Sequence, residues 1–383
     1  MTKRRCGLRV GLAAAVAVAC GAVATGRAAP PAPVTRLPAI EPAVARPVQG
    51  LPLEWEYDAV HEREVPDWVL RAAAAVTIAV IDTGGDLEAP DLAAKAPTAY
   101  NVRTRTADVV DTSGHGTFVA SLAAGSVSNG DGIAGFGGDA RLMVIKASRG
   151  GGFSDLDEAA AIVYATEHGA RIINMSFGGP RTSQTERKAV AYAAAHGVLL
   201  VAAAGNEAGT GDRPSYPAAL VQPVGSNGAG GSGLAVAAST STGERARFSN
   251  SGSYVSLAAP GENVFGAVSA SAPSARYPRV PLPGSLSGLY GFASGTSFAA
   301  PQVAGAAALV WAANPLLTAA QVADLLKQTA SGDGTWNPDL GFGVIDVAAA
   351  VAAATAHPAV ELGGAGKQLG VPLRWRLAAA AAP

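Results

Sequence analysis

The chain has 383 residues, with 28 Lys and Arg against 29 Asp and Glu. This length is enough for one large domain or two ordinary ones with a substantial core. The charges nearly cancel, and neither a long basic run nor an acidic tail is present, so a nucleic-acid track is excluded and no nucleic-acid partner is expected.

The first 24 residues have the pattern of an export signal. Lys3, Arg4 and Arg5 precede an apolar run from about Leu8 to Ala24. That run is too short for a membrane-spanning helix, which needs roughly 18 or more apolar residues. Residues 1–24 are therefore predicted to be a signal peptide, and the protein to be secreted or held in the cell envelope. An uncleaved anchor is the alternative.

Both cysteines of the chain, Cys6 and Cys20, lie in this leader, so no disulfide is expected after it. Cys20 follows Ala17-Val18-Ala19, a sequence that loosely resembles a bacterial lipoprotein processing site. In that alternative the leader ends before Cys20 and a lipid on Cys20 holds the protein to a membrane. It is the one case in which a membrane partner is expected.

Three further regions follow the leader. Residues 25–50 are rich in Pro and lack apolar periodicity, which predicts a linker or a short pro-segment. Residues 51–356 alternate between apolar, β-branched runs and helical patterns and are predicted to form one domain. Residues 357–383 form a C-terminal tail that is polar around Arg374-Trp375-Arg376, and disorder is one expectation for it.

The elements of the central region predict an α/β fold, a parallel β-sheet with helices on both faces. The apolar runs are short and mostly uninterrupted, as in strands that are covered on both sides. The predicted strands are Val76–Asp82, Leu142–Lys146, Arg171–Met175, Val198–Ala203, Leu234–Ala238 and Tyr254–Ala258. The predicted helices are Thr117–Ala124, Leu156–His168, Thr185–His196, Phe298–Ala312 and Ala319–Thr329.

Four short segments, far apart in the chain, each carry one group that acyl-transfer chemistry needs. They are Val80–Gly84, Gly114–Thr117, Ala203–Asn206 and Gly295–Pro301, which supply an acid, a base, an oxyanion donor and a nucleophile in that order. Each segment alone is weak evidence, because turns, helix ends and helix caps use the same residue types. Their combination at predicted strand and helix ends is specific.

The role expected of each group follows from its predicted position. Ser297 opens a helix, with Pro301 near its start, so its own N–H can face a developing oxyanion. His115 lies between two glycines and is a natural general base near neutral pH. Asp82 ends a strand and is expected to orient His115, while the side-chain amide of Asn206 is expected to complete the oxyanion hole.

The order Asp, His, Asn, Ser resembles that of the subtilisin-like serine proteases, the subtilases, over roughly Leu51 to Ala356. The resemblance implies a monomeric serine endopeptidase that hydrolyses polypeptides through an acyl-enzyme on Ser297. Many subtilases carry a folded prodomain, and residues 25–50 are too short for one. Either this chain folds unaided, or help comes from elsewhere.

The resemblance also implies a substrate cleft. Gly151 and Gly152 are expected to pair with an extended peptide as an added strand. Two segments are expected to wall the primary pocket: Ser176, Phe177 and Gly178 on one side, and Ala203, Ala204 and Gly205 on the other. Such small, uncharged walls suit an apolar or aromatic side chain, and Glu207 could tolerate a basic one.

A structural calcium site is implied at Asp91 and Asn129, which match the family's high-affinity site by position. Hard cations take oxygen ligands, and a loop that offers carboxylate, amide and carbonyl oxygens suits Ca²⁺. A turn that needs no metal is the alternative for this loop.

The sequence leaves two alternatives to the endopeptidase, an acid peptidase and a binding protein without activity. A sedolisin-like acid peptidase shares the Gly-Thr-Ser segment but uses Glu as its base, and His115 in its own motif argues against it. A catalytically idle binding protein on the same fold would lack at least one of the four groups, and all four are present here.

Overall fold

The computed structural model describes residues 34–36, 52–129, 132–149, 152–280 and 289–357. The chain divides after Pro31 into two units, and all described residues belong to the second. The predicted signal peptide with Cys20, most of residues 25–50, Gly151 and nearly all of the C-terminal tail lie outside the described residues.

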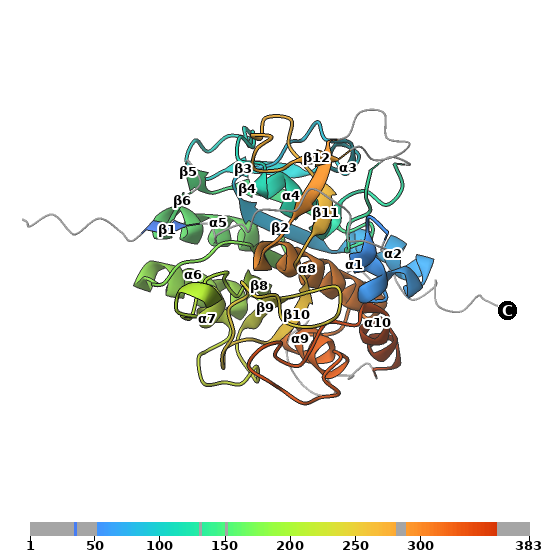
Figure 1. The fold of residues 1–383 in the computed structure, drawn as a ribbon. Helices are drawn as coiled ribbons and strands as arrows, with labels where there is room; N and C mark the ends of the chain where they lie inside the picture. The colour runs from blue at the N-terminus through green and yellow to red at the C-terminus, as the bar shows by residue number, and fades with distance from the viewer. Residues whose placement is uncertain (1–33, 37–51, 130–131, 150–151, 281–288, 358–383) are drawn as a thin grey trace, which may run out of the picture. The chain divides into compact units, whose positions relative to one another are not determined.

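A seven-stranded parallel sheet forms the centre of this unit (Figure 1). Its strands are almost entirely buried, as the uninterrupted apolar runs predict for a sheet covered on both faces. In spatial order they are β10 (Leu257–Pro260), β9 (Gly233–Ser239), β8 (Leu199–Ala203), β7 (Ile172–Met175), β2 (Thr77–Asp82), β4 (Arg141–Lys146) and β3 (Thr98–Asn101).

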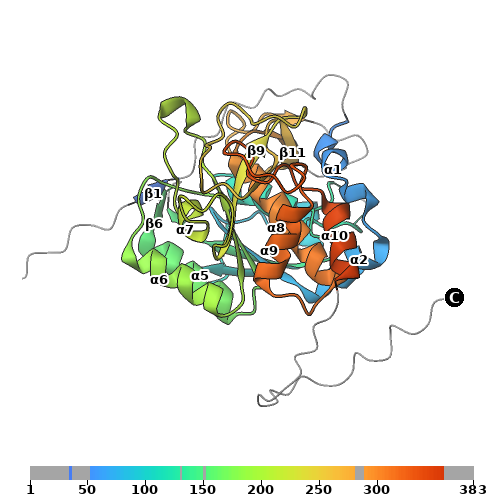
Figure 2. The same cartoon turned by 90° about the horizontal axis from the view of Figure 1, so that it is seen from below.

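The main helices cover the two faces of the sheet. α4 (His115–Ala124) and α8 (Thr296–Ala313) pack on each other and on one face, whereas α5 (Asp155–Glu167) and α6 (Gln184–Ala195) pack together on the other (Figures 1 and 2). From β2 the chain runs through α3 (Pro90–Ala93) to the edge strand β3, then through α4 to β4, and α5 leads from β4 past β2 to β7.

Two small antiparallel sheets and several short helices complete the unit. One sheet contains β1 (Val34–Arg36), β6 (Gly152–Ser154) and β5 (Ser148–Arg149), so residues 25–50 contribute one short strand. The other contains β11 (Val264–Ala267), β13 (Tyr290–Ala293) and β12 (Arg279–Val280). The remaining helices are α1 (Trp55–Ala59), α2 (Asp67–Ala72), α3 (Pro90–Ala93), α7 (Ala218–Val221), α9 (Ala319–Gln328) and α10 (Val347–Ala356), with 3₁₀ turns at Glu62–Glu64, Ala73–Ala75 and Ala208–Thr210.

The predicted elements are confirmed with small shifts at their ends, and one strand was placed too early. The sequence predicted a strand over Tyr254–Ala258, but the ladder begins only at Leu257. Tyr254 instead lies in the preceding turn, where its buried hydroxyl donates to the carbonyl of Ala204 at 2.7 Å. Tyr254 is therefore buried because of a tertiary contact, and in the sequence it looked like the first residue of a strand.

α8 runs through the core with 17 of its 18 residues buried, and this explains its content of small side chains. At Gly305 an added Cβ would lie 2.6 Å from the backbone carbonyl carbon of Phe136. No helix of the described residues is both long and apolar enough to cross a bilayer.

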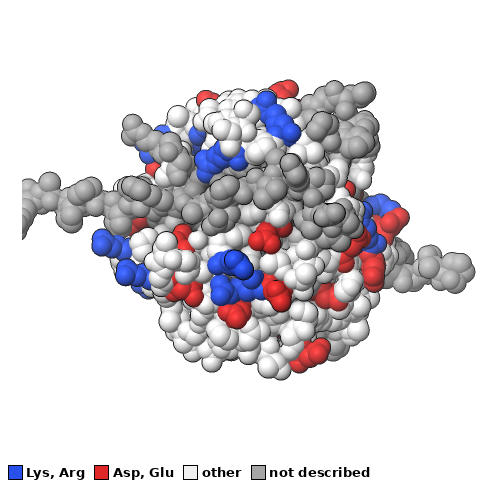
Figure 3. Space-filling model, viewed as in Figure 1, with Lys and Arg blue, Asp and Glu red and all other residues white. Residues whose placement is uncertain are grey.

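The face of the molecule in Figure 3 carries both signs of charge. Among the described residues of this face, Lys and Arg side chains are interspersed with Asp and Glu. Neither sign of charge therefore dominates the described part of this face.

Candidate active site

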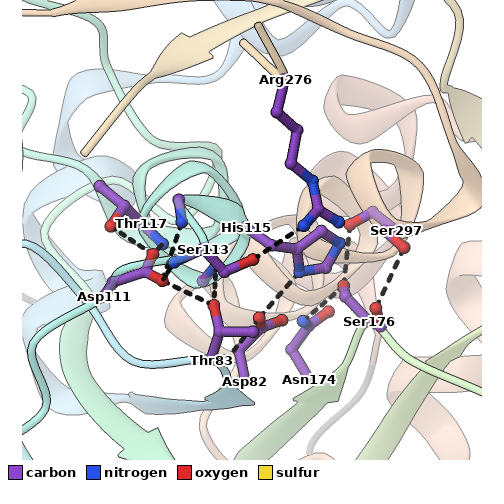
Figure 4. A network of polar contacts seen from close by, with 12 residues as sticks. Asp82, Thr83, Asp111, Ser113, His115, Thr117, Asn174, Ser176, Arg276 and Ser297 are labelled. Atoms are coloured by element: carbon purple, nitrogen blue, oxygen red, sulfur yellow. Dashed lines mark hydrogen bonds and ion pairs between the residues drawn. The ribbon is translucent and has the colours of Figure 1, made fainter. Parts of the chain in front are cut away.

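The four segments meet at the carboxyl edge of the sheet, beside the point where the strand order reverses: two of them lie at strand ends and two at helix starts. β2 ends at Asp82, β7 ends at Met175 just before Ser176, and β8 ends at Ala203, three residues before Asn206. This edge, at a reversal of strand order, is where open α/β sheets bind ligands. α4 and α8 begin at the same place, with His115 and Ser297 in their first turns (Figure 4).

Asp82 and His115, the predicted acid and base, lie in contact with each other. Oδ1 of Asp82 lies 2.8 Å from Nδ1 of His115 and also accepts the N–H of Thr83 at 2.7 Å. Both side chains are fully buried. Because a carboxylate accepts hydrogen bonds, this contact assigns the proton of a neutral His115 to Nδ1 and leaves Nε2 as the acceptor.

Asp111 organises the start of α4 and was not singled out from the sequence. Its buried carboxylate accepts hydrogen bonds from five donors around the turn that leads into His115. The donors are Thr83 Oγ1 at 2.8 Å, Ser113 N at 3.1 Å, Gly114 N at 2.9 Å, Thr117 N at 2.8 Å and Thr117 Oγ1 at 2.7 Å. The hydroxyl of Thr83 also accepts the N–H of Gly116 at 2.9 Å, so the strand that carries Asp82 is tied to the helix that carries His115.

The glycines that flank His115 are required by close backbone contacts. Gly114 has φ of 83°, a left-handed conformation that favours glycine. A Cβ on Gly116 would lie 2.2 Å from the carbonyl oxygen of Gly84, the residue two places after Asp82. Glycine therefore lets the segments that carry Asp82 and His115 approach each other.

Pro301 and Ser176 together fix the backbone at Ser297, the predicted nucleophile. The sequence placed Pro301 in a first turn, but it is the sixth residue of α8 and so removes an N–H from the helix interior. The carbonyl that loses this donor belongs to Ser297, and it accepts the hydroxyl of Ser176 at 2.8 Å instead. Asn174 Nδ2 donates to the same Ser176 oxygen at 2.9 Å.

Ser297 and His115 lie side by side but are not hydrogen-bonded to each other (Figure 4). Oγ of Ser297 donates to the carbonyl of Ser176 at 3.0 Å, while Nε2 of His115 has no hydrogen-bond partner. The ring of Phe298 packs against the imidazole, with centroids 5.5 Å apart. Hydrogen bonds between such groups are often long or absent in the free protein and tighten only when substrate binds.

Asn206 is oriented by Thr296, the residue before the nucleophile. Its Oδ1 accepts both the N–H of Thr296 at 2.9 Å and the hydroxyl at 2.8 Å. Because a backbone N–H can only donate, this pairing assigns the amide orientation, with Nδ2 on the side of Gly295. A Cβ on Gly295 would lie 3.2 Å from Nδ2. The amide donor therefore lies beside the turn that presents Ser297.

The predicted pocket walls are the ends of the neighbouring strands β7 and β8. Phe177 is buried and stacks on Phe153 of β6, with ring centroids 4.2 Å apart. Gly178 is approached closely by Ser215, whose hydroxyl would be 2.3 Å from an added Cβ. On the other wall the carbonyl of Ala204 is held by Tyr254. The walls thus consist of small residues backed by aromatic rings.

Glu207 is already engaged by its neighbours. Its Oε2 accepts the N–H of Asn206 at 2.9 Å and Nδ2 of Asn250 at 3.1 Å. The N–H of Glu207 in turn donates to Oδ1 of Asn250 at 2.6 Å. This charge therefore supports the turn that carries Asn206, and it favours a basic substrate residue less than the sequence suggested.

The strand expected to pair with substrate is β6, which contains Gly152. One edge of β6 pairs with β5, and the other pairs with β1 in the antiparallel sense, with Arg36 opposite Gly152. The edge of β6 therefore accepts an extended chain, as strand addition of a peptide requires.

Asp91, the predicted calcium ligand, is enclosed by the loop that carries Asn129. Asp91 is fully buried; Oδ1 accepts Ile133 N–H at 3.0 Å and lies 3.5 Å from Nδ2 of Asn129, while Oδ2 accepts the hydroxyl of Tyr290 at 3.0 Å. A Cβ on Gly132 would lie 2.0 Å from Oδ1, so the loop backbone closes on the carboxylate. The three contacts described here all bring donors to the carboxylate, and in the described residues no three His, Cys, Asp or Glu side chains are grouped to hold a metal, so the calcium site stays a prediction.

The chain belongs to the subtilase family, whose model matches residues 73–343. It is 34% identical over 272 residues to the thermophilic serine proteinase of Bacillus sp. (strain AK1), covering 70% of this chain and 60% of that protein. It is 35% identical over 278 residues to subtilisin E of Bacillus subtilis (strain 168), covering 72% and 65%. The chain thus spans less than two thirds of these relatives' lengths.

The fold is similar to that of a solved structure of the same family. Fervidolysin from Fervidobacterium pennivorans, described as a keratinolytic enzyme related to subtilisin, matches with a TM-score of 0.70 and 27% identity. The match covers 87% of this chain and 52% of that one. The parallel sheet and its helices are therefore those of the family.

Proposed function

We propose that this protein is an exported serine endopeptidase that hydrolyses peptide bonds through an acyl-enzyme on Ser297. The observation that carries the proposal is the buried pair of Asp82 and His115, which leaves Nε2 of His115 unpartnered next to Ser297. A buried acceptor without a partner is rare in a purely structural role. Here it is positioned to take the hydroxyl proton of Ser297.

In the acylation step, Oγ of Ser297 attacks the substrate carbonyl carbon as Nε2 of His115 accepts its proton. Asp82 stabilises the resulting imidazolium and does not itself take the proton. His115 then gives the proton to the leaving amine as the C–N bond breaks, which forms the acyl-enzyme. In deacylation, water attacks the ester, His115 takes a proton from that water, and it returns the proton to Oγ of Ser297.

Negative charge develops on the substrate oxygen in both steps. We infer that Nδ2 of Asn206 and the N–H of Ser297 donate to it, because Thr296 orients the amide and Ser297 lies in the first turn of α8. N–H groups in the first turn have no helical carbonyl to bond, so they are available to an anion.

Two rival functions make different demands on the same residues. An acid peptidase of the sedolisin type would need Glu as the base, but the group beside Ser297 is His115, held by Asp82. An idle binding protein would use the cleft without the triad. In that case Ser297→Ala would bind peptides as the parent does, and the parent would cleave none.

Peptide hydrolysis by the full chain, its Ser297→Ala variant and its Ser113→Ala variant tests the proposal. Ser113 is a neighbouring serine whose hydroxyl, among the described residues, accepts one hydrogen bond, from the exposed Arg276, so it is the matched control. Cleavage by the parent and by Ser113→Ala, with a loss of several orders of magnitude in kcat for Ser297→Ala, is expected. Near-parent activity of Ser297→Ala would refute the assignment.

We also propose that Ca²⁺ stabilises the fold through Asp91 and Asn129. An ion that binds only the folded state adds about 2.7 kcal/mol at a hundredfold excess over Kd. Melting of the Ser297→Ala protein should therefore shift upward with Ca²⁺ relative to chelator, and Asp91→Asn should remove the shift, whereas Asp67→Asn on the exposed α2 should keep it. Equal melting temperatures with Ca²⁺ and with chelator would show a loop that needs no metal.

A signal peptide in residues 1–24 underlies the proposed export. The sequence of the mature N-terminus, read from protein secreted by a bacterial host, would place the cleavage site. Release into the medium with a start after Ala24 agrees with plain secretion. A lipid-modified Cys20 at the N-terminus would instead show membrane attachment.

A further inference from the structure

A pocket of about 280 Å³ lies next to the triad, where β2 and β4 end. Its lining residues include Thr83, Lys146, Ser148 and Arg276. Thr83 directly follows Asp82. Nη1 of Arg276 donates to Oγ of Ser113, two residues before His115, at 3.2 Å (Figure 4). Whole small-molecule ligands occupy sites of about 300–1,000 Å³, so this pocket suits one side chain rather than a cofactor. We call it the β2–β4 pocket.

The β2–β4 pocket is lined by cations and hydroxyl groups, with no carboxylate among its described lining residues. In the described part of the chain, neither Lys146 nor Arg276 forms an ion pair. An ammonium has three N–H donors and a guanidinium has five. Lys146 uses one of them on the carbonyl of Val110 and Arg276 uses one on Ser113, so most of these donors are left for an anion.

Ser148 adds a buried hydroxyl to the same pocket. The residue exposes 5% of its surface, and its Oγ has no hydrogen-bond partner among the described residues. A buried hydroxyl without a partner costs free energy, and such groups in native proteins mostly bond to water or to a ligand. Ser148 lies in β5, two residues after Lys146 at the end of β4, and residues two apart in an extended chain point to the same side. The hydroxyl and the ammonium therefore serve one ligand.

The segment that carries Arg276 is fixed to the turn that leads into α4. Oγ of Ser269 donates to the carbonyl of Asp111 at 2.9 Å. A Cβ on Gly114 would lie 2.5 Å from Cβ of Ala272, so the segment packs directly against this turn. The position of Arg276 is therefore set by contacts that do not depend on its own side chain.

The β2–β4 pocket and the predicted primary pocket lie on opposite sides of Asp82. The walls of the primary pocket continue from β7 and β8, and β7 adjoins β2 on one side, whereas β4 adjoins β2 on the other. Side chains of successive residues in an extended chain point to opposite sides. When one substrate side chain enters the primary pocket, the side chain of an adjacent residue therefore points toward the β2–β4 pocket.

We propose that the β2–β4 pocket binds an Asp or Glu side chain of a polypeptide substrate, on a residue directly next to the one whose carbonyl Ser297 attacks. The inference rests on the proposed endopeptidase function and names a specificity of it. Lys146 and Arg276 supply positive charge, and Oγ of Ser148 supplies one further donor. A carboxylate accepts several hydrogen bonds at once, so it can bond to all three groups.

Peptides that differ only by Glu or Gln test this subsite. The change is placed directly before or directly after the residue whose carbonyl is attacked, in a peptide with one mapped cleavage site. Both peptide ends are blocked, so the side chain carries the only carboxylate. One or two charge-assisted hydrogen bonds at a partly exposed site correspond to a preference for Glu of roughly 5- to 30-fold in kcat/KM, expected at one of the two positions.

Substitutions in the pocket should remove this preference. Arg276→Gln and Lys146→Gln should each reduce the ratio of the Glu to the Gln peptide several-fold. The control Arg105→Gln removes an exposed cation that is not among the lining residues, and it should keep the ratio. Because Arg276 is exposed, Arg276→Gln decides the test even where Lys146→Gln does not fold.

The possible outcomes separate this inference from the proposed function. Ser297-dependent cleavage with equal kcat/KM for Glu and Gln at both positions, or with a preference that survives Arg276→Gln, overturns the subsite alone. If no peptide is cleaved, the proposed function fails, and fluorescence anisotropy of the same peptides on the Ser297→Ala protein measures the subsite directly. Tighter binding of a Glu peptide than of its Gln partner then supports the subsite, and equal affinities overturn it.

Discussion

Replacing Asp111 with Asn should loosen the start of α4, although Asp111 is outside the predicted catalytic set. The carboxylate accepts hydrogen bonds from five donors, three on Oδ1 and two on Oδ2. An amide can keep the three on its oxygen, but its NH₂ group cannot accept the N–H and hydroxyl of Thr117. Two charge-assisted bonds are lost, and the buried N–H of Thr117 then faces another donor. Losses of this kind cost about 2–4 kcal/mol.

This cost should appear as a lower melting temperature. For a domain of this size, 1 kcal/mol corresponds to roughly 2–4 °C, so Asp111→Asn should melt about 4–16 °C below its parent. Both proteins would carry Ser297→Ala, which prevents self-cleavage during heating. Asp108→Asn is the matched control, because the exposed Asp108 accepts only one long hydrogen bond, from Val110 N at 3.3 Å. A melting temperature of Asp111→Asn within 1 °C of the parent would refute the reasoning.

Three further perturbations follow from the structure. Burial raises the pKa of Glu62 to about 7 from 4.5, so its contribution to stability is complete below about pH 4.5 and is lost as pH rises through 7. Glu62→Gln should remove up to about 3 kcal/mol of this pH dependence of stability, measured from melting curves at several pH values. An equal pH dependence of stability in Glu62→Gln and in the exposed control Glu64→Gln would contradict this prediction. Gly116→Ala should yield little folded protein because its Cβ would lie 2.2 Å from Gly84 O, and Gly209→Ala, with nothing within 4 Å, should fold normally; equal yields would argue against this contact. Asn206→Ala should lower kcat about 10²- to 10³-fold, the scale known for the oxyanion asparagine of subtilisin, with KM little changed, and an equal kcat would exclude Asn206 from the oxyanion hole.

Much of the fold and the four catalytic candidates could be predicted because they depend on local patterns. Apolar runs that end in a polar residue marked the carboxyl edge, where Asp82 and Asn206 lie. The Gly residues around His115 and the helix start at Ser297 are also local signals. β3 and α10 were missed for opposite reasons. β3 is a partly exposed edge strand with a polar composition, and α10 is so rich in Ala that it shows no helical periodicity.

The supporting residues could not be predicted, because packing between distant segments creates them. Ser176 supports Ser297 only because Pro301 frees a carbonyl and because β7 lies beside α8. Asp111 did leave a local signal, an Asp that precedes a helix start by a few residues, and capping rules could have found it.

The central claim is that His115, held by Asp82, activates Ser297. The most direct measurement is the rate at which an organophosphonate probe labels the intact protein, with the modified residue located by peptide mass spectrometry. The mechanism predicts a single adduct on Ser297, slowed by several orders of magnitude in His115→Ala and unaffected in His196→Ala, a control at the far end of α6. Labelling at another residue, or an equal labelling rate in His115→Ala, would contradict it.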